Sequence, residues 1–130
     1  MKKQKNTSEV KGRNTKNSKA RGNSYERKIV NELKELGFDV CTSRAESKNM
    51  DDNKIDILDR NNQLPYIQLK LTQATPNYFK IESECPLKDK PFVIIWSKTI
   101  PTEKTFRSIG EIAMIPKSFF YELIKSYYGK

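Results

Sequence analysis

The sequence predicts an α/β fold, in which a mixed sheet of four or five strands is flanked by helices. Two helical patterns frame the chain, because apolar residues recur at helical spacing over 24–36 and again after Pro116. The strand-like runs between them cover 38–44, 54–58, 66–71, 91–96 and 111–115. Of these, 91–96 is continuously apolar and fits a central strand buried on both faces. We expect the first helix on one side of the sheet and the last helix packed nearby.

The first helix is expected at 24–36. Asn23 and Ser24 are residue types that cap helix starts, and Gly37 interrupts the apolar spacing. Glu26 falls on the stripe that faces the core, where an unpaired carboxylate is costly, so it needs a partner. With Asn23 as the cap, Glu26 would occupy the capping-box position and simply close the helix start. The alternative is a functional carboxylate.

Residues 1–22 are expected to form a disordered basic tail in front of one folded domain at 23–130. The tail has eight Lys and Arg residues, one acid and three apolar side chains, so it carries +7 of the net charge of +9. So few apolar groups cannot offset the entropy lost on ordering. Such an arm adds salt-dependent affinity for nucleic acid. A solubilising tail or a cloning remnant is the alternative.

Composition excludes several classes of function. No apolar run is long enough for a membrane span and none resembles a secretory signal, so we expect a cytoplasmic protein. The two cysteines, Cys41 and Cys85, form no disulfide framework or zinc motif and are expected as small, reduced core residues. The chain has no histidine, which excludes Ser-His and Cys-His catalysis and His-based zinc sites. Acid–base chemistry must then use carboxylates, Lys, Tyr or a metal ion.

The runs at 54–58 and 66–71 are joined by turn-forming residues, so they predict a β-hairpin. If the hairpin is centred near Asn62, Asp56 lies opposite Gln68. Side chains alternate along a strand, which places the apolar residues of the second run on one face and its two polar residues on the other. The apolar face holds Ile67, Leu69 and Leu71, and the polar face holds Gln68 and Lys70.

The polar face brings together a carboxylate from Asp56, an amide oxygen from Gln68 and an ammonium group from Lys70. A divalent cation such as Mg²⁺ prefers oxygen ligands, and a lysine beside it can position an attacking water or a phosphate oxygen. This combination is the minimum for metal-assisted phosphodiester hydrolysis. The alternative is an ordinary solvated hairpin.

In these residues the chain resembles the PD-(D/E)XK nuclease superfamily, whose hairpin carries Asp on one strand and Glu-x-Lys on the next. The matching positions are Asp56 and the tripeptide Gln68-Leu69-Lys70. The chain departs from the pattern twice. Ile55 stands where the family name has Pro, and Gln68 replaces the second acid, which removes one negative charge from the site.

The order Glu26, Arg44, Asp56, Gln68-x-Lys70 is similar to the Glu, Arg, Asp, Glu-x-Lys order of archaeal-type Holliday-junction resolvases. The resemblance covers residues 23 to about 124 and implies a restriction-endonuclease-like core. It implies that Arg44 clamps a phosphate. A surface salt bridge from Arg44 to Glu46 or Asp52 is the alternative.

The resemblance also implies the roles of the site residues. Asp56, the Gln68 side-chain oxygen, the Leu69 backbone carbonyl and Glu26 would hold Mg²⁺, for which Mn²⁺ could substitute. Lys70 would position the attacking water, so the catalytic set is Glu26, Asp56, Gln68 and Lys70. Residues expected to contact DNA are Arg44, Gln73, Asn77, Tyr78 and Lys80. Tyr78 would stack on an unpaired base, or else Tyr78 and Phe79 anchor a loop to the core.

The function implied is metal-dependent resolution of four-way DNA junctions during recombination, in a bacterial or phage-infected cell. Two symmetric nicks need two active sites, so a homodimer is expected. One alternative is another nicking or restriction-like DNA endonuclease. Another is a non-catalytic nucleic-acid-binding relic of the nuclease fold.

Overall fold

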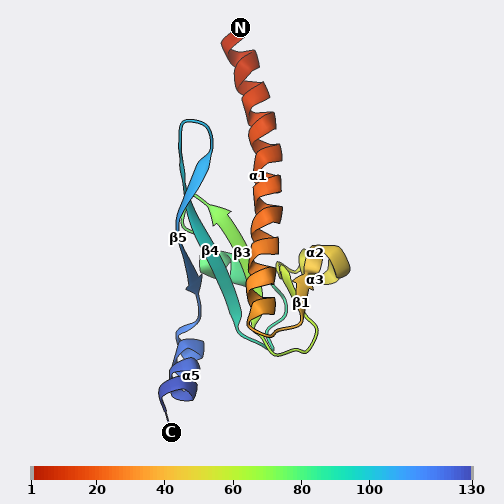
Figure 1. Ribbon diagram of the computed structural model, residues 1–130, viewed down its shortest axis with the longest axis vertical. Coiled ribbons are helices and arrows are strands. Elements are labelled where there is room, and N and C mark those ends of the chain that lie inside the picture. The colour runs from red at the N-terminus through yellow and green to blue at the C-terminus, as the bar shows by residue number, and fades with distance from the viewer. Residues whose placement is uncertain (1, 130) are drawn as a thin grey trace.

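The computed structural model describes the backbone of residues 2–129 and the side chains of residues 19–129. The α/β class is confirmed. The elements follow the order α1 (Lys2–Glu35), β1 (Val40–Thr42), α2 (Ser43–Glu46), α3 (Lys48–Asp52), β2 (Ile57–Asp59), β3 (Tyr66–Thr72), α4 (Tyr78–Ser83), β4 (Phe92–Pro101), β5 (Phe106–Met114) and α5 (Lys117–Tyr128) (Figure 1).

The strands of the described part form two sheets, so the expectation of one four- or five-stranded sheet is wrong. β1 and β2 are an antiparallel pair, whereas β4 lies between a parallel β3 and an antiparallel β5. The predicted hairpin is wrong, because β2 pairs with β1 and not with β3. Lys54 adopts a left-handed φ of 69° at the end of α3, where the Ile55 N–H donates to the Met50 carbonyl, and β2 follows at Ile57. Asp56 N–H still donates to the Ile67 carbonyl at 2.8 Å, which joins the two sheets.

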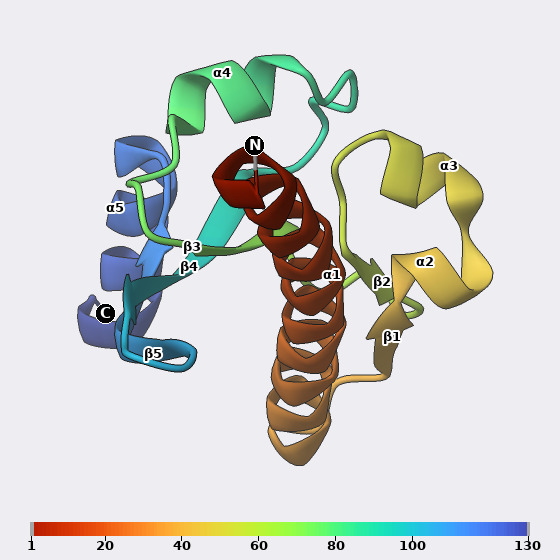
Figure 2. The same cartoon turned by 90° about the horizontal axis from the view of Figure 1, so that it is seen from above.

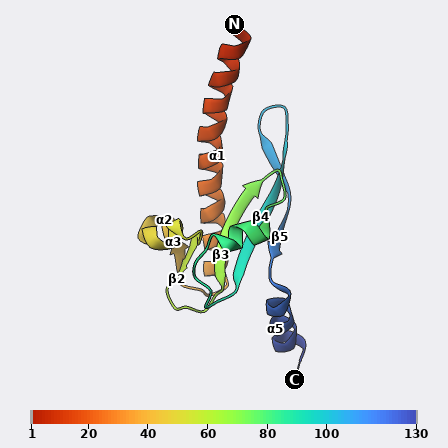
Figure 3. The ribbon, with the colours of Figure 1, turned by 180° about the vertical axis from the view of Figure 1, so that it is seen from behind.

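The larger sheet lies between α1 and α4, which cover opposite faces (Figures 1 and 3). The core under α1 contains Tyr25, Ile29, Val30, Val40, Ile57, Ile67 and Leu69. The core on the other face contains Ile55, Tyr66, Cys85, Phe92, Ile94 and Trp96. The alternation predicted for β3 is therefore confirmed for its apolar residues. The central position and burial of β4 are confirmed as well.

Helix α1 ends where the sequence predicted, because Gly37 has a φ of +100° that L side chains rarely adopt. Its start differs from the prediction, since the helical backbone begins at Lys2 and runs through most of the segment expected as a tail. That part of α1 extends past the sheet (Figure 1). The basic arm predicted for residues 1–22 falls largely on side chains outside the described range.

Short helices replace part of the strand predicted at 38–44 and the loop predicted after it. Ser43 and Arg44 belong to α2, and Ser47 caps α3 by accepting the Met50 N–H. At the other end of the chain, Pro116 is the cap of α5 rather than its first residue. No described residue of α5 is buried, so the packing expected for the last helix is wrong. None of the helices searched in the described part is long and apolar enough to cross a membrane.

Candidate active site

Asp56 lies next to Gln68, as predicted from the turn at Asn62. Its backbone N–H donates to the Ile67 carbonyl at 2.8 Å, and its carboxylate Oδ2 accepts the Leu69 N–H at 2.7 Å. Asp56 is therefore held by the residues on either side of Gln68. The backbone at Asn62 agrees with the predicted turn, because its φ of 53° is left-handed and Asn tolerates this conformation better than most residues.

Burial raises the pKa of Asp56 to about 6. The Leu69 N–H and the positive charge of Lys70 oppose this by lowering the pKa, whereas the negative charges of Glu26 and Asp51 raise it further. Glu26, Asp51 and Lys70 therefore lie near enough to Asp56 to influence its ionisation. Asp51 was not among the predicted residues.

Gln68 is buried, with 8% of its surface exposed, on a strand whose next polar residue, Lys70, is half-buried. The Gln68 Oε1 atom has no hydrogen-bond partner among the described residues. A buried acceptor without a donor is costly unless a cation or a donor reaches it. This orphaned oxygen belongs to the tripeptide predicted to bind a metal ion.

Glu26 forms an ion pair with Arg44, with 3.2 Å between Oε1 and Nε. The capping-box interpretation of Glu26 is wrong, because α1 begins long before Asn23. Arg44 does form a salt bridge, as the alternative predicted, but with Glu26 rather than with Glu46 or Asp52, and Glu46 pairs with Arg60. The Glu26 side chain is 17% exposed and that of Arg44 is 42% exposed, so Arg44 covers a largely buried acid while part of it still faces solvent.

Ser43 positions the segment that carries Asp56, and sequence reasoning missed it. The residue is fully buried, its Oγ donates to the Ile55 carbonyl at 2.5 Å, and its N–H donates to the Asp56 carbonyl at 2.8 Å. A serine at the end of a short strand carries no sequence signal for this role, because its partners are twelve and thirteen residues away.

The segment after Lys70 has mixed roles. Asn77 caps α4 by accepting the Lys80 N–H, and Tyr78 donates to the Phe92 carbonyl at 2.6 Å while its ring packs against Phe92. For Tyr78, the structure thus shows the anchoring alternative. Gln73 and Lys80 are exposed, and their contact with DNA stays a prediction. Phe79 is the exposed aromatic of the segment, at 81%.

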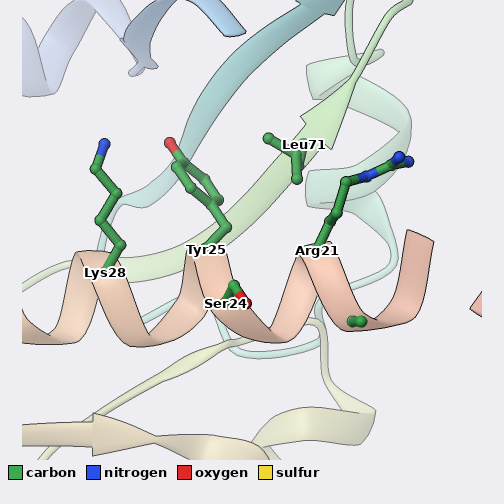
Figure 4. Close-up of a pocket in the computed structure, with 6 residues that line it drawn as sticks. Arg21, Ser24, Tyr25, Lys28 and Leu71 are labelled. Atoms are coloured by element: carbon green, nitrogen blue, oxygen red, sulfur yellow. The ribbon is translucent and has the colours of Figure 1, made fainter. Parts of the chain in front are cut away.

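A separate cavity of about 370 Å³ lies between α1 and β3 (Figure 4). Arg21, Tyr25 and Lys28 project from the side of α1 on which Leu71 of β3 lies. Tyr25 and Lys28 already donate to the Glu111 carboxylate on β5 at 2.8 and 2.7 Å. The Lys28 hydrogen bond is the main reason that the pKa of Glu111 is lowered. These groups tie α1 to β5 and are not part of the predicted site.

The oxygen donors around Asp56 fit a hard cation better than a transition metal, because the set has neither sulfur nor imidazole. Within the described range, no three Asp, Glu or Cys side chains lie close enough together to hold a metal ion. A metal ion at this site would therefore need the Gln68 amide oxygen and a backbone carbonyl beside the acids. No protein-family model matches this chain, and neither a curated protein nor a solved structure is detectably similar to it.

Proposed function

We propose that this chain is a metal-dependent DNA endonuclease that resolves four-way junctions by phosphodiester hydrolysis. One observation carries the proposal: hydrogen bonds with Ile67 and Leu69, the neighbours of Gln68, fix the buried Asp56 against β3, and the charges of Glu26 and Lys70 influence its pKa. This supports a site that contains Glu26, Asp56, Gln68 and Lys70, in the roles that the resemblance to junction resolvases implies. A solvated hairpin would not need a buried carboxylate there.

The arrangement of the elements supports a restriction-endonuclease-like core. β3 carries the Gln68-Leu69-Lys70 tripeptide and is joined to the parallel β4 by a crossover through α4, while α1 covers the other face and supplies Glu26. Figure 2 shows α1 between the two sheets, and its apolar residues pack against strands of both, while Glu26 pairs with Arg44 of α2. The hydrogen bond from the Asp56 N–H to the Ile67 carbonyl joins the two sheets, which supports treating their strands as parts of one core.

The residues that would hold Mg²⁺ are Asp56, the Gln68 oxygen, the Leu69 carbonyl and Glu26. The orphaned Gln68 Oε1 fits this role, because a cation would satisfy it. When bound, Mg²⁺ supplies positive charge that stabilises the negative charge developing on the phosphate. Mn²⁺ prefers similar oxygen ligands and should substitute.

The side chains of the protein supply the remaining functions of the site. Lys70 positions the attacking water and donates to a phosphate oxygen, and Asp56 is ionised above about pH 6, where the pKa of this buried carboxyl lies. Arg44 neutralises Glu26 and presents its exposed part to the DNA backbone. Gln73, Lys80 and the basic residues of 1–22 would contact the strands on either side. The protein would act as a homodimer in the cytoplasm of a bacterial or phage-infected cell.

A second candidate is a non-catalytic DNA-binding module, and one observation favours it: an amide replaces the acid at Gln68, so the site has less negative charge to attract a cation. The test is cleavage of a synthetic four-way junction and a matched linear duplex, each with Mg²⁺ or EDTA. The proposal expects Mg²⁺-dependent nicking of the junction. Equal cutting of the duplex would indicate another DNA endonuclease, and binding without cutting would indicate the non-catalytic module.

A further inference from the structure

The exposed apolar side chains of the described part are concentrated at the C-terminal end. Eight of the ten large apolar residues found exposed lie on β5 and α5, while the other two are Leu36 and Phe79. We call these eight the C-terminal apolar surface: Ile109, Ile112, Phe120, Tyr121, Leu123, Ile124, Tyr127 and Tyr128. These eight side chains on two consecutive elements call for an occupant, because folded monomers rarely leave large apolar patches in water.

Helix α5 in particular lacks a partner within the described chain. The stripe formed by Phe120, Leu123, Ile124 and Tyr127 has the spacing of a helix face that packs on another element. The aromatic and cation–π contacts that α5 makes in the described part stay within the helix, as between Tyr127 and Tyr128. The helix leaves the sheet and extends away from it (Figures 1 and 3). Isolated helices of about twelve residues are marginal in water, so α5 needs a surface to pack on.

The same chain offers apolar hollows that such a helix could fill. One of about 270 Å³ is formed by Trp96, Ile109 and Ile112, with Lys98 and Gly110 at its edge. Another of about 470 Å³ lies where β5 leads into α5 and includes Tyr78, Phe79, Met114, Ile115, Pro116 and Lys117. Each chain therefore carries both a projecting apolar helix and apolar hollows.

We propose that the C-terminal apolar surface is covered by the same surface of a second copy of this chain, in a two-fold dimer with α5 of each copy packed against β5 of the other. A chain that carries both the projecting helix α5 and the apolar hollows at β5 has a self-complementary surface. A two-fold dimer interface requires such a surface. The proposal deepens the proposed function and rests on it for the choice of partner, because two symmetric nicks need two active sites.

The available area agrees with a dimer. The exposed parts of the eight side chains amount to roughly 800 Å², given that aromatic side chains bury about 150–250 Å² each. Stable interfaces take about 800 Å² from each partner, whereas the largest apolar patch of a typical monomer is about 300–600 Å². DNA is a poor occupant, because surfaces that bind DNA are polar and basic and none of the eight residues is charged.

Sedimentation velocity of the full-length protein, without DNA or metal ions, tests the interface. The variants are Ile112→Lys and Tyr127→Glu, whose residues are 55% and 81% exposed, so neither change removes core packing. Leu36→Glu is the matched control, because Leu36 is 72% exposed but lies outside this surface. Wild type and Leu36→Glu should sediment as dimers at micromolar concentration, and the two other variants should dissociate at least tenfold more readily while circular dichroism stays unchanged.

A wild type that is monomeric at all concentrations would overturn the proposal, and so would two variants that remain as dimeric as the control. If the monomeric wild type also sedimented with vesicles of anionic phospholipid, a membrane would be the occupant instead. Junction cleavage is measured separately on the same samples. A dimer that does not cut DNA refutes only the proposed function, and a monomer that cuts DNA refutes only this interface.

Discussion

The Asp56 carboxylate is largely buried and accepts a single backbone hydrogen bond, from Leu69. Its pKa is raised from the ordinary 3.8 to about 6, chiefly by burial. Between these pH values the folded state binds more protons than the unfolded state, so the free energy of unfolding falls as pH rises from about 4 to about 6. Above that range the cost of the buried charge is constant. This cost is what a bound cation would offset.

We therefore expect Asp56→Asn to stabilise the metal-free protein at pH 8 by up to about 3 kcal/mol, as the size of the pKa shift implies. The amide oxygen can still accept the Leu69 N–H, and it carries no charge. Urea unfolding in EDTA at pH 4 and pH 8 measures this. At pH 4 the two proteins should be nearly equal. An Asp56→Asn variant that is less stable than wild type at pH 8 would contradict the burial argument.

The same variant should bind junctions but not cut them.

The metal-binding role of Gln68 distinguishes an active enzyme from a non-catalytic relic of the nuclease fold. An amide oxygen can bind Mg²⁺ but adds no negative charge, so wild type should need more Mg²⁺ than a site with two carboxylates. Gln68→Glu should lower the Mg²⁺ concentration for half-maximal cleavage, and Gln68→Ala should lose both metal affinity and rate. A titration of junction nicking with Mg²⁺ compares the three proteins. The same metal dependence in wild type and Gln68→Ala would remove Gln68 from the metal site.

At the scale of elements, two glycines give a matched test of where α1 begins and ends. Gly37 has a φ of +100°, so Gly37→Ala should cost about 1 kcal/mol. Gly22 lies inside α1 with open space around its Cα, so Gly22→Ala should stabilise the protein by up to about 1 kcal/mol. Thermal unfolding by circular dichroism should show shifts of opposite sign. No effect of Gly22→Ala would indicate that the stable part of the helix begins after residue 22.

Deletion of residues 1–22 tests the basic arm. Because cationic side chains bind DNA through release of counterions, the truncated protein should bind a four-way junction more weakly, with a shallower dependence of affinity on salt concentration. Fluorescence anisotropy at several salt concentrations measures both. Cleavage at saturating enzyme should persist, since the site residues begin at Glu26. An unchanged affinity and salt slope would show that the segment does not bind DNA.

Sequence patterns predicted the elements whose signal is local and repeated. The end of α1 at Gly37, the buried strand β4 and the alternation of β3 follow from periodicity and turn chemistry. The short helices α2 and α3 were missed, because a cap such as Ser47 gives them little signal. The partner of Glu26 was also missed, since Arg44 lies eighteen residues away and only the tertiary fold brings it close.

For the whole molecule, the prediction of one continuous sheet is wrong at the point where the two observed sheets meet. The left-handed Lys54 closes α3 just before Asp56, and the Asp56 N–H and carboxylate then join the two sheets through Ile67 and Leu69. The irregular backbone that defeated the hairpin prediction is therefore the feature that presents the acid at the site. Packing of α5 could not be predicted either, because a helical apolar stripe does not say whether it is covered by its own chain or by another.

Single-turnover cleavage of a labelled four-way junction in Mg²⁺ by wild type, Lys70→Ala and Lys48→Ala tests both the cleavage activity and the part of Lys70 in it. Lys70 lies in the proposed site, whereas Lys48 is an exposed lysine on α3 and serves as the matched control. Wild type and Lys48→Ala should nick the junction at the same rate, and Lys70→Ala should be slower by at least about a hundredfold, a loss typical of a group that assists proton transfer. A wild type that leaves the junction intact, or a folded Lys70→Ala that cuts as fast as the control, would contradict the account.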